Sequence, residues 1–188
     1  MISAILLAAG ESKRMRGENK LTKLYRGKPL IQHSIKNILE SSIDELIIIL
    51  GYQNTSLQNF IEKNKKIKIV INKNYAIGMS SSIKLGIKNL SKMTDAFFIC
   101  LADMPLIDKN IYDDLIKSKK NNDIIVPIYK GQQGNPILFS KLMIDEILNI
   151  KGDNGAKDIL KKNIVKKQML PVENEAVILD FDTQDNFK

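Results

Sequence analysis

The chain has 188 residues, 44% of them hydrophobic, which is enough to bury a sizeable core, and we expect one domain over residues 1–188. Its formal net charge of +8 comes from lysines spread along the whole chain rather than gathered with aromatic residues, which argues against a nucleic-acid partner. The single cysteine, Cys100, excludes an intrachain disulfide, and no apolar run reaches the ~18 residues that cross a membrane, so we expect a reducing, cytoplasmic location.

Four short apolar runs rich in Ile predict strands that are buried on both faces of a parallel sheet. They cover residues 2–8, 46–50, 67–71 and 97–101. Between them, apolar residues recur at helical spacing, as at Ile31, Ile35 and Ile38 and again at Ile83 and Ile87. This alternation predicts an α/β fold with a mostly parallel central sheet, in which the loops after successive strands meet at one ligand-binding edge.

In the second half of the chain the apolar pattern is more often interrupted by turn-forming residues. Residues 123–129 and 136–139 flank a turn-rich connection, which predicts paired strands that project over the ligand crevice. A helix is expected from residue 140 to about residue 150, a short helix over 156–161, and a last strand over 176–180.

The loop after the first predicted strand has the composition of a phosphate cradle. Gly10 would let the backbone turn without a Cβ clash, and the amides that follow are free to donate to anionic oxygens. Arg14 adds a fork of donors and Lys20 a mobile positive charge. The two commonest glycine loops are excluded, because Ser12 occupies the second glycine position of Gly-x-Gly-x-x-Gly and no Gly-Lys-Ser/Thr follows Gly10.

This loop resembles the Leu-Ala-Ala-Gly-x-Ser-x-Arg-Met-Gly…Lys signature of the MobA-like nucleotidyltransferases. Further family motifs follow in family order along nearly the whole chain. They are Gly78-Met79-Ser80-Ser81-Ser82, Leu101-Ala102-Asp103-Met104-Pro105, Gly134-Asn135-Pro136, Gly152-Asp153-Asn154-Gly155-Ala156 and Asp180-Phe181-Asp182-Thr183. The resemblance implies a three-layer Rossmann-like nucleotidyltransferase fold and transfer of a nucleotidyl group to a phosphorylated acceptor.

The resemblance also implies the roles of individual residues. Lys20 would contact the α-phosphate and Arg14 would clamp the leaving phosphates, although Lys20 read alone is also compatible with a solvated loop lysine. The expected nucleotide-binding residues are Leu7, Ala8, Ala9, Gly10, Ser12, Arg14, Lys20, Ser80, Ser81 and Ser82. The three serines are equally compatible with capping the helix that follows them.

A metal site is expected at Asp103, which follows closely after an apolar predicted strand. Mg²⁺ takes only one or two protein carboxylates and fills its other positions with phosphate oxygens and water. Asp182, which follows the last predicted strand, is the candidate second ligand, and capping of a short terminal helix is its alternative role. His33 is interpreted as an ordinary helix residue with its hydrogen bonds satisfied, and Cys100 as a buried thiol.

The acceptor is expected in two late loops that depart from the family pattern. The candidate residues are Gly134, Asn135, Pro136, Asp153, Gly155 and Lys157. The resemblance implies transfer of a cytidylyl group from CTP, with Mg²⁺, to the terminal phosphate of a molybdopterin-type cofactor that could serve a molybdoenzyme client. The alternatives are GTP as donor, a sugar, polyol or choline phosphate as acceptor, or a non-catalytic protein that binds a cofactor and passes it to its partner.

Overall fold

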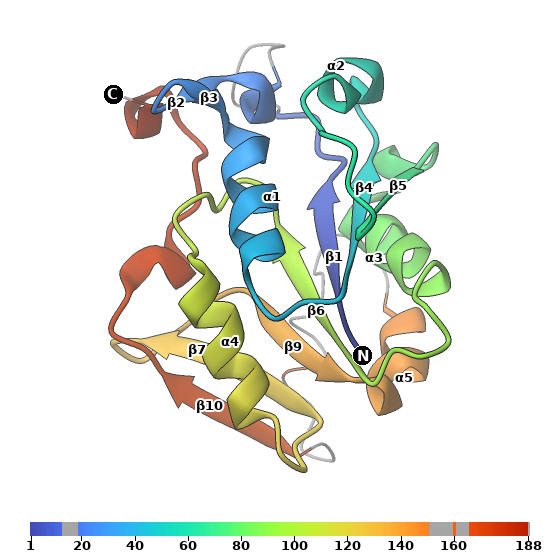
Figure 1. Cartoon of the computed structure of the whole chain (residues 1–188), viewed down its shortest axis with the longest axis vertical. Coiled ribbons are helices and arrows are strands. Elements are labelled where there is room, and N and C mark those ends of the chain that lie inside the picture. The colour runs from blue at the N-terminus through green and yellow to red at the C-terminus, as the bar shows by residue number, and fades with distance from the viewer. Residues whose placement is uncertain (13–18, 151–159, 161–165, 188) are drawn as a thin grey trace.

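The computed structural model describes residues 1–12, 19–150, 160 and 166–187. The described residues form an eight-stranded sheet in which the order is β10-β7-β9-β6-β1-β4-β5, with β8 paired to β7 (Figure 1). The strands are β1 Ile2–Ala8, β4 Glu45–Leu50, β5 Ile67–Ile71, β6 Ala96–Leu101, β7 Ile124–Tyr129, β8 Gln132–Gln133, β9 Ile137–Ser140 and β10 Lys167–Pro171. A small antiparallel sheet pairs β2, Leu24–Tyr25, with β3, Lys28–Pro29.

The parallel part of the sheet confirms the four predicted strands. β1 lies between β4 and β6, so that Leu6 is level with Ile48 on one side and Cys100 on the other. Burial on both faces is correct for these three strands but wrong for β5, where Ile69 and Ile71 are 40% and 44% exposed. β5 pairs only with β4 at the edge of the described sheet, which explains its exposure.

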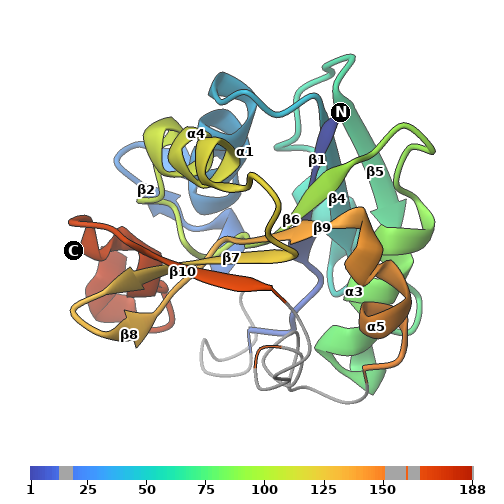
Figure 2. The same cartoon turned by 90° about the horizontal axis from the view of Figure 1, so that it is seen from below.

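Helices cover both faces and produce the predicted α/β/α layers (Figures 1 and 2). The helices are α1 Leu30–Glu40, α2 Asn54–Gln58, α3 Met79–Lys88, α4 Lys109–Ser118 and α5 Ile144–Leu148. Apolar residues of α1 and α4 pack on one face of the sheet, and those of α3 and α5 pack on the other. Among the residues that the structure describes, no helix has the length and apolar content to cross a membrane.

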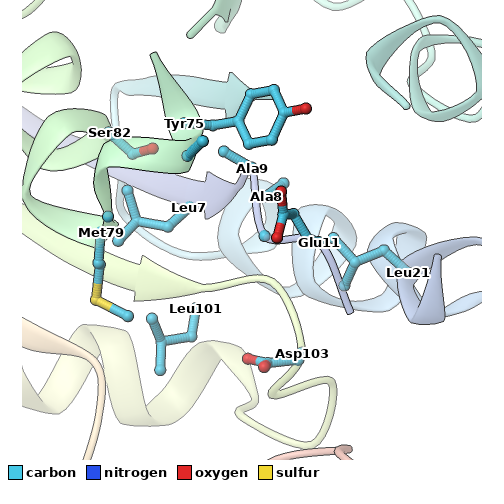
Figure 3. Close-up of a pocket in the computed structure, with 13 residues that line it drawn as sticks. Leu7, Ala8, Ala9, Glu11, Leu21, Tyr75, Met79, Ser82, Leu101 and Asp103 are labelled. Carbon is cyan, nitrogen blue, oxygen red and sulfur yellow. The ribbon is translucent and has the colours of Figure 1, made fainter. Parts of the chain in front are cut away.

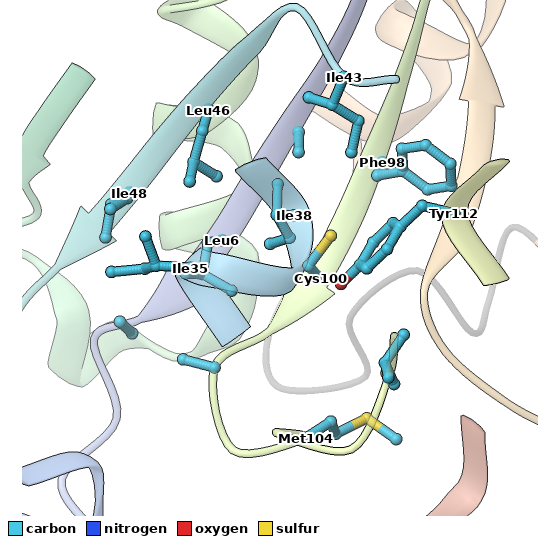
Figure 4. Packing of buried hydrophobic residues seen from close by; sticks show 14 of the residues in the cluster. Leu6, Ile35, Ile38, Ile43, Leu46, Ile48, Phe98, Cys100, Met104 and Tyr112 are labelled. Atoms are coloured by element: carbon cyan, nitrogen blue, oxygen red, sulfur yellow. The ribbon is translucent and has the colours of Figure 1, made fainter. Parts of the chain in front are cut away.

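The core between α1, α4 and the sheet surrounds the cysteine (Figure 4). Cys100 is buried as expected, next to Tyr112 of α4. Burial raises the pKa of the Cys100 thiol to about 12, although its hydrogen bond with Tyr112 acts in the opposite direction. The thiol is therefore protonated and unreactive at neutral pH.

The paired strands of the second half lie elsewhere than expected. β7 and β9 are antiparallel neighbours, as predicted, but they belong to the central sheet and do not project over the crevice. β9 is inserted between β6 and β7 and runs opposite to both. Its amino end therefore lies at the sheet edge where β6 ends.

The last elements differ most from the predictions. The helix expected over 140–150 is a 3-10 turn, Lys141–Met143, followed by α5. The helix expected over 156–161 falls almost wholly outside the described residues. The last strand expected over 176–180 is wrong, because residues Glu175–Ile178 form a 3-10 helix whose Ala176 and Val177 are buried. The last strand is instead β10, whose lysine, glutamine and proline conceal the strand pattern.

Gly86 of α3 provides a test of the packing between α3 and β1. A Cβ at this position would lie 2.4 Å from Cγ2 of Ile5, which is fully buried and stiff at χ1. Alanine would gain about 1 kcal/mol in helix propensity, but overpacking costs about 1–3 kcal/mol. We expect Gly86→Ala to lower the free energy of unfolding by up to about 2 kcal/mol in urea titrations. Lys88→Ala, at an exposed position of the same helix, is the control, and a Gly86→Ala midpoint at or above that of the wild type would contradict the packing argument.

Candidate active site

A cavity of about 270 Å³ opens at the carboxyl ends of β1 and β6, beside the start of α3 (Figure 3). The side chains and backbone around it come from the loop after β1, from residues that precede and begin α3, and from the loop after β6. They are Leu7, Ala8, Ala9, Gly10, Glu11, Leu21, Tyr75, Ala76, Gly78, Met79, Ser82, Leu101 and Asp103. This is the edge at which doubly wound sheets bind ligands.

The structure brings together many of the predicted nucleotide-binding residues. Leu7, Ala8, Ala9, Gly10 and Ser82 line the cavity. The remaining described members of the set, Ser12, Lys20, Ser80 and Ser81, do not line it. Arg14 lies outside the described residues.

Gly10 has a different role from the one predicted. Its φ is not in the left-handed region, and a Cβ built on it would have no atom within 4 Å. The chain's own packing therefore does not require glycine here. What glycine provides is an uncovered stretch of backbone on the cavity wall, where a ligand can approach closely.

The backbone at Lys20 is held by two polar side chains. Ser12, whose φ is 51°, accepts a hydrogen bond of 3.1 Å from the backbone N–H of Lys20 through its Oγ. Asn19 is buried and caps the 3-10 helix Lys20–Thr22 by accepting a bond of 3.1 Å from the N–H of Leu21. Ser12 is thus connected to Lys20, although through the backbone rather than the ammonium group.

The ammonium group of Lys20 lies between two carboxylates. Its Nζ donates to Oδ2 of Asp103 at 2.6 Å and to Oδ1 of Asp182. The three side chains are 14%, 20% and 28% exposed respectively. Burial acts to lower the pKa of Lys20, but the charges and hydrogen bonds of Asp103 and Asp182 outweigh it and raise the pKa. We call these three residues the lysine–carboxylate triad.

The two carboxylates of the triad come from separate segments of the chain. Asp103 follows β6, and the adjacent carbonyl of Ala102 accepts a hydrogen bond of 3.0 Å from Ser34 of α1. The N–H of Phe181 donates to the carbonyl of Asp103 at 2.8 Å, which brings Asp182 alongside. Both predicted metal ligands are therefore adjacent to the predicted phosphate-binding lysine.

The donor set fits a divalent cation. Within the described part of the chain, Oδ1 of Asp103 is buried and has no hydrogen-bond partner, and an unsatisfied carboxylate oxygen is costly. A hard cation would satisfy it. No group of three or more candidate metal ligands occurs among the described residues, so protein and nucleotide would share the coordination, as Mg²⁺ commonly requires.

The three serines at the start of α3 have structural partners. Asn72 donates to Oγ of Ser81 at 2.8 Å and to Oγ of Ser82 at 2.9 Å, while Ser80 is buried. Ser81 also donates to the carbonyl of Gly78, as a residue in the first helical turn can. The capping role expected for these serines is wrong, because the N-cap of α3 is Gly78 and no side chain makes a capping hydrogen bond there. Ser82 combines its bond from Asn72 with a place on the cavity wall.

The expected acceptor loop lies at the same edge of the sheet. Ile137 pairs with Ile99, so the loop before β9 is level with the end of β6, near Asp103. The N–H of Asn135 donates to the carbonyl of Val177 at 2.8 Å, and a Cβ on Gly134 would lie 2.5 Å from that oxygen. Close packing therefore explains the glycine. Pro136 is buried beside it, and Asp153, Gly155 and Lys157 lie outside the described residues.

Two residues near the site were not anticipated from the sequence. Tyr75 lines the cavity, and its only signal was its place just before the Gly78 motif. Asp180 belongs to the motif that contains Asp182, and its pKa is raised by burial and by the charges of Asp182 and Asp103. His33 behaves as expected, since its Nε2 lies 2.7 Å from the carbonyl oxygen of Tyr25.

Comparisons with known proteins agree with this fold. The chain superposes on a nucleotidyl transferase from Methanothermobacter thermautotroptrophicus with a TM-score of 0.87 at 17% identity, covering 100% of this chain and 94% of that one. It superposes on the manganese complex of Rv0371c from Mycobacterium tuberculosis H37Rv with a TM-score of 0.83 at 21% identity, covering 99% and 95%. The fold is that of the nucleotidyltransferases.

Sequence comparison identifies the family. The model of the MobA-like NTP transferase domain matches residues 4–169, and the chain therefore belongs to this family of nucleotidyltransferases. The molybdenum cofactor cytidylyltransferase of Escherichia coli (strain K12) is 30% identical over 186 residues, which cover 99% of this chain and 93% of that protein.

The lysine–carboxylate triad predicts a pH-dependent contribution to stability. Lys20→Met removes the ammonium between the two carboxylates, and we expect it to lower the free energy of unfolding at pH 7 by about 1–3 kcal/mol. Because the folded-state pKa of Lys20 is raised above its ordinary 10.5, this contribution is complete below that pH and is lost as the pH rises through the raised pKa.

Urea unfolding of the two proteins between pH 7 and pH 11.5 measures this difference. Lys36→Met is the matched control, since Lys36 pairs with Glu40 at 3.7 Å on the surface and is 63% exposed. It should change stability by no more than about 0.5 kcal/mol. A Lys20→Met difference that is equal to that of the control, or that persists undiminished at the highest pH, would contradict the role of the triad.

Proposed function

We propose that this protein, acting as one domain, transfers a cytidylyl group from CTP to the terminal phosphate of a molybdopterin-type cofactor and releases pyrophosphate. The observation that carries the proposal is the lysine–carboxylate triad beside the cavity at the end of β1. The identity of 30% with a molybdenum cofactor cytidylyltransferase over nearly both full lengths supports the choice of substrates. The product would be passed to a molybdoenzyme.

The proposed reaction needs alignment and charge stabilisation more than covalent chemistry by the protein. An acceptor phosphate oxygen attacks the α-phosphorus, and pyrophosphate leaves in line with it. Lys20 is the group that would contact the α-phosphate, where negative charge increases in the transition state. Arg14 would hold the leaving phosphates. The exposed backbone at Gly10 would allow the triphosphate to approach the cavity wall.

Asp103 and Asp182 are the residues that would hold a magnesium ion. When bound, the ion would neutralise charge on the phosphates. The unpartnered Oδ1 of Asp103 supports this assignment, as does the manganese in the complex of Rv0371c, whose fold this chain shares. In that state Lys20 would exchange its carboxylate partners for the phosphate.

The choice of CTP rests on Leu7-Ala8-Ala9-Gly10, since the resemblance implies Ala-Gly-Gly at this place in guanylyl-transferring relatives, and the choice of acceptor rests on the family resemblance. A guanylyl donor or a sugar, polyol or choline phosphate acceptor would use the same triad. A non-catalytic carrier of a cofactor would need neither a lysine at the α-phosphate nor a metal. The chemistry of the triad therefore favours an enzyme over a carrier, whichever acceptor is used.

A pyrophosphate-release assay with each of the four NTPs against a panel of phosphorylated acceptors, with mass spectrometry of the products, tests the proposal. We expect release to require CTP, a molybdopterin-type acceptor and a divalent cation, and the product to gain the mass of CMP. Turnover with GTP or with a sugar phosphate alone would replace the proposed substrates. Tight binding of cofactor without turnover under any combination would identify a carrier.

Lys20→Ala and Asp103→Ala should each reduce kcat about 10²–10³-fold while the protein stays folded, because each removes charge that acts on the reacting phosphate. Matched control variants are Lys28→Ala and Asp114→Ala, which change exposed residues of the same types. Near-native turnover by either folded site variant would remove that residue from the catalytic assignment.

Asn135 tests the position of the acceptor. Among the described residues its backbone N–H has a hydrogen-bond partner and its side-chain amide has none, so the amide is available to a ligand at this edge of the sheet. Asn135→Ala should raise the KM for the acceptor several-fold and leave the KM for CTP nearly unchanged, since uniform binding of one substrate is lost. Steady-state kinetics with each substrate varied in turn measure both constants. A larger change in the KM for CTP would place this loop on the nucleotide.

A further inference from the structure

The end of the chain contributes to the triad. We call residues 181–187 the C-terminal strap, which Figure 1 shows next to β2 and β3. The family model matches only as far as residue 169, so Asp182 comes from a segment beyond that match. Some feature of this chain must therefore hold Asp182 at Lys20.

The strap is attached by aromatic contacts to the β2–β3 hairpin, which follows the 3-10 helix that contains Lys20. The ring of Phe181 lies edge-on to that of Tyr25, with 4.9 Å between centroids and 75° between planes. Phe187 lies edge-on to Phe181 at 5.6 Å, and the Nζ of Lys23 lies 5.9 Å from the centroid of Phe187. Edge-to-face pairs at these distances are attractive, and Phe181 is only 5% exposed.

Tyr25 lies close to Lys20 in the sequence, and its ring contacts Phe181, the neighbour of Asp182. The 3-10 helix Lys20–Thr22 leads directly into β2, which contains Tyr25. Phe181 immediately precedes Asp182. The Tyr25–Phe181 ring contact therefore acts together with the backbone bond from Phe181 to the carbonyl of Asp103 to hold the Asp182 carboxylate near Lys20.

Tyr25 is itself held in place by its surroundings. His33 of α1 packs edge-on against its ring at 5.4 Å, and the His33 Nε2 lies 2.7 Å from its carbonyl oxygen. The guanidinium carbon of Arg26 lies 5.1 Å from its ring centroid. These contacts involve the ring and the backbone, so phenylalanine at position 25 would retain them.

Hydrogen bonds within the strap also orient Asp182. Oδ1 of Asn186 accepts hydrogen bonds from the N–H of Asp182 at 3.1 Å, from the N–H of Thr183 at 2.9 Å and from Oγ1 of Thr183 at 3.0 Å. One side-chain oxygen thus closes the turn that begins at Asp182. The Asp182 backbone is fixed by Asn186 on one side and by Phe181 on the other.

We propose that Tyr25 is a positioning residue of the active site, because its ring holds Phe181 and thereby keeps Asp182 within reach of Lys20 and of the divalent cation. The inference rests on the proposed function, in which Asp182 is a metal ligand. It assigns the strap to the metal half of the site, where Asn186 would act in the same direction as Tyr25. Neither residue touches the reacting atoms.

The test compares Tyr25→Ala, Tyr25→Phe, Asp182→Asn and the double variant Tyr25→Ala/Asp182→Asn. Two quantities are measured: the Mg²⁺ concentration for half-maximal turnover with saturating substrates, and the dissociation constant of Mn²⁺ from the CTP-bound protein by electron paramagnetic resonance. We expect Tyr25→Ala to raise both about two- to tenfold, the range that corresponds to loss of one aromatic pair, without changing the KM for the acceptor. Tyr25→Phe should match the wild type.

The double variant separates positioning from general damage. If Tyr25 acts through Asp182, adding Tyr25→Ala to Asp182→Asn should raise the metal constants no further. The same fold-increase in both backgrounds, or a Tyr25→Phe protein as impaired as Tyr25→Ala, would overturn the inference. If Tyr25→Ala does not fold, Asn186→Ala takes its place with the same expected shift and the same double variant, and an unshifted metal constant would overturn the role of the strap.

The Asp182→Asn protein distinguishes a failure of the proposed metal site from a failure of the positioning role of Tyr25. Unchanged metal constants in this variant would overturn the metal assignment in the proposed function, and the positioning role with it. Raised metal constants in Asp182→Asn together with wild-type constants in Tyr25→Ala would leave the proposed function intact and overturn only the positioning role.

Discussion

The ion pairs of Lys20 with Asp103 and Asp182 are the constraint on which the site depends. Lys20 follows the loop after β1, Asp103 follows β6, and Asp182 lies near the end of the chain, 162 positions from Lys20. The two carboxylates repel each other at short range, and the ammonium that bonds to both offsets this repulsion. In the proposed reaction a metal cation would pair with the two carboxylates, and a phosphate anion would pair with Lys20. These ligands would replace the internal ion pairs with little change in local charge.

The sheet accounts for where these segments meet. Because β1, β6 and β7 are parallel, their carboxyl ends lie at one edge, and the reversed β9 brings its amino end to that edge as well. The cavity wall, Asp103 and the loop at Asn135 are therefore neighbours although they come from distant parts of the chain. Ser34, through the carbonyl of Ala102, connects this edge to α1.

The sequence was most informative where a strand is buried on both faces. Such strands must be apolar throughout, so β1, β4 and β6 were visible as runs, and a charged residue at the end of a run, such as Asp103, stood out. β10 was not visible, because an edge strand tolerates lysine and proline, and the apolar residues around Val177 are buried by a 3-10 helix without entering the sheet. Periodicity does not distinguish these two ways of burying a short apolar run.

Composition likewise cannot say what a glycine or an aromatic residue is for. Gly10 and Gly134 both belong to family motifs, yet the first has open space around it and the second is pressed against Val177. Tyr25 and Phe181 are far apart in sequence and carry no motif signal as a pair, so only the folded chain reveals that they meet.

The direction of β9 has a consequence for how such a protein can diversify. The connection from β7 to β9 begins with a short hairpin of β7 and β8, whose turn at Lys130 and Gly131 is exposed, so this turn can lengthen, shorten or change side chains without disturbing the layers beneath. The loop after β1, by contrast, ends at a lysine whose position is set by three separate segments. Under the proposed function, mutations that alter the acceptor could accumulate near this hairpin, while Lys20 and its two carboxylate partners would stay under strong structural restraint.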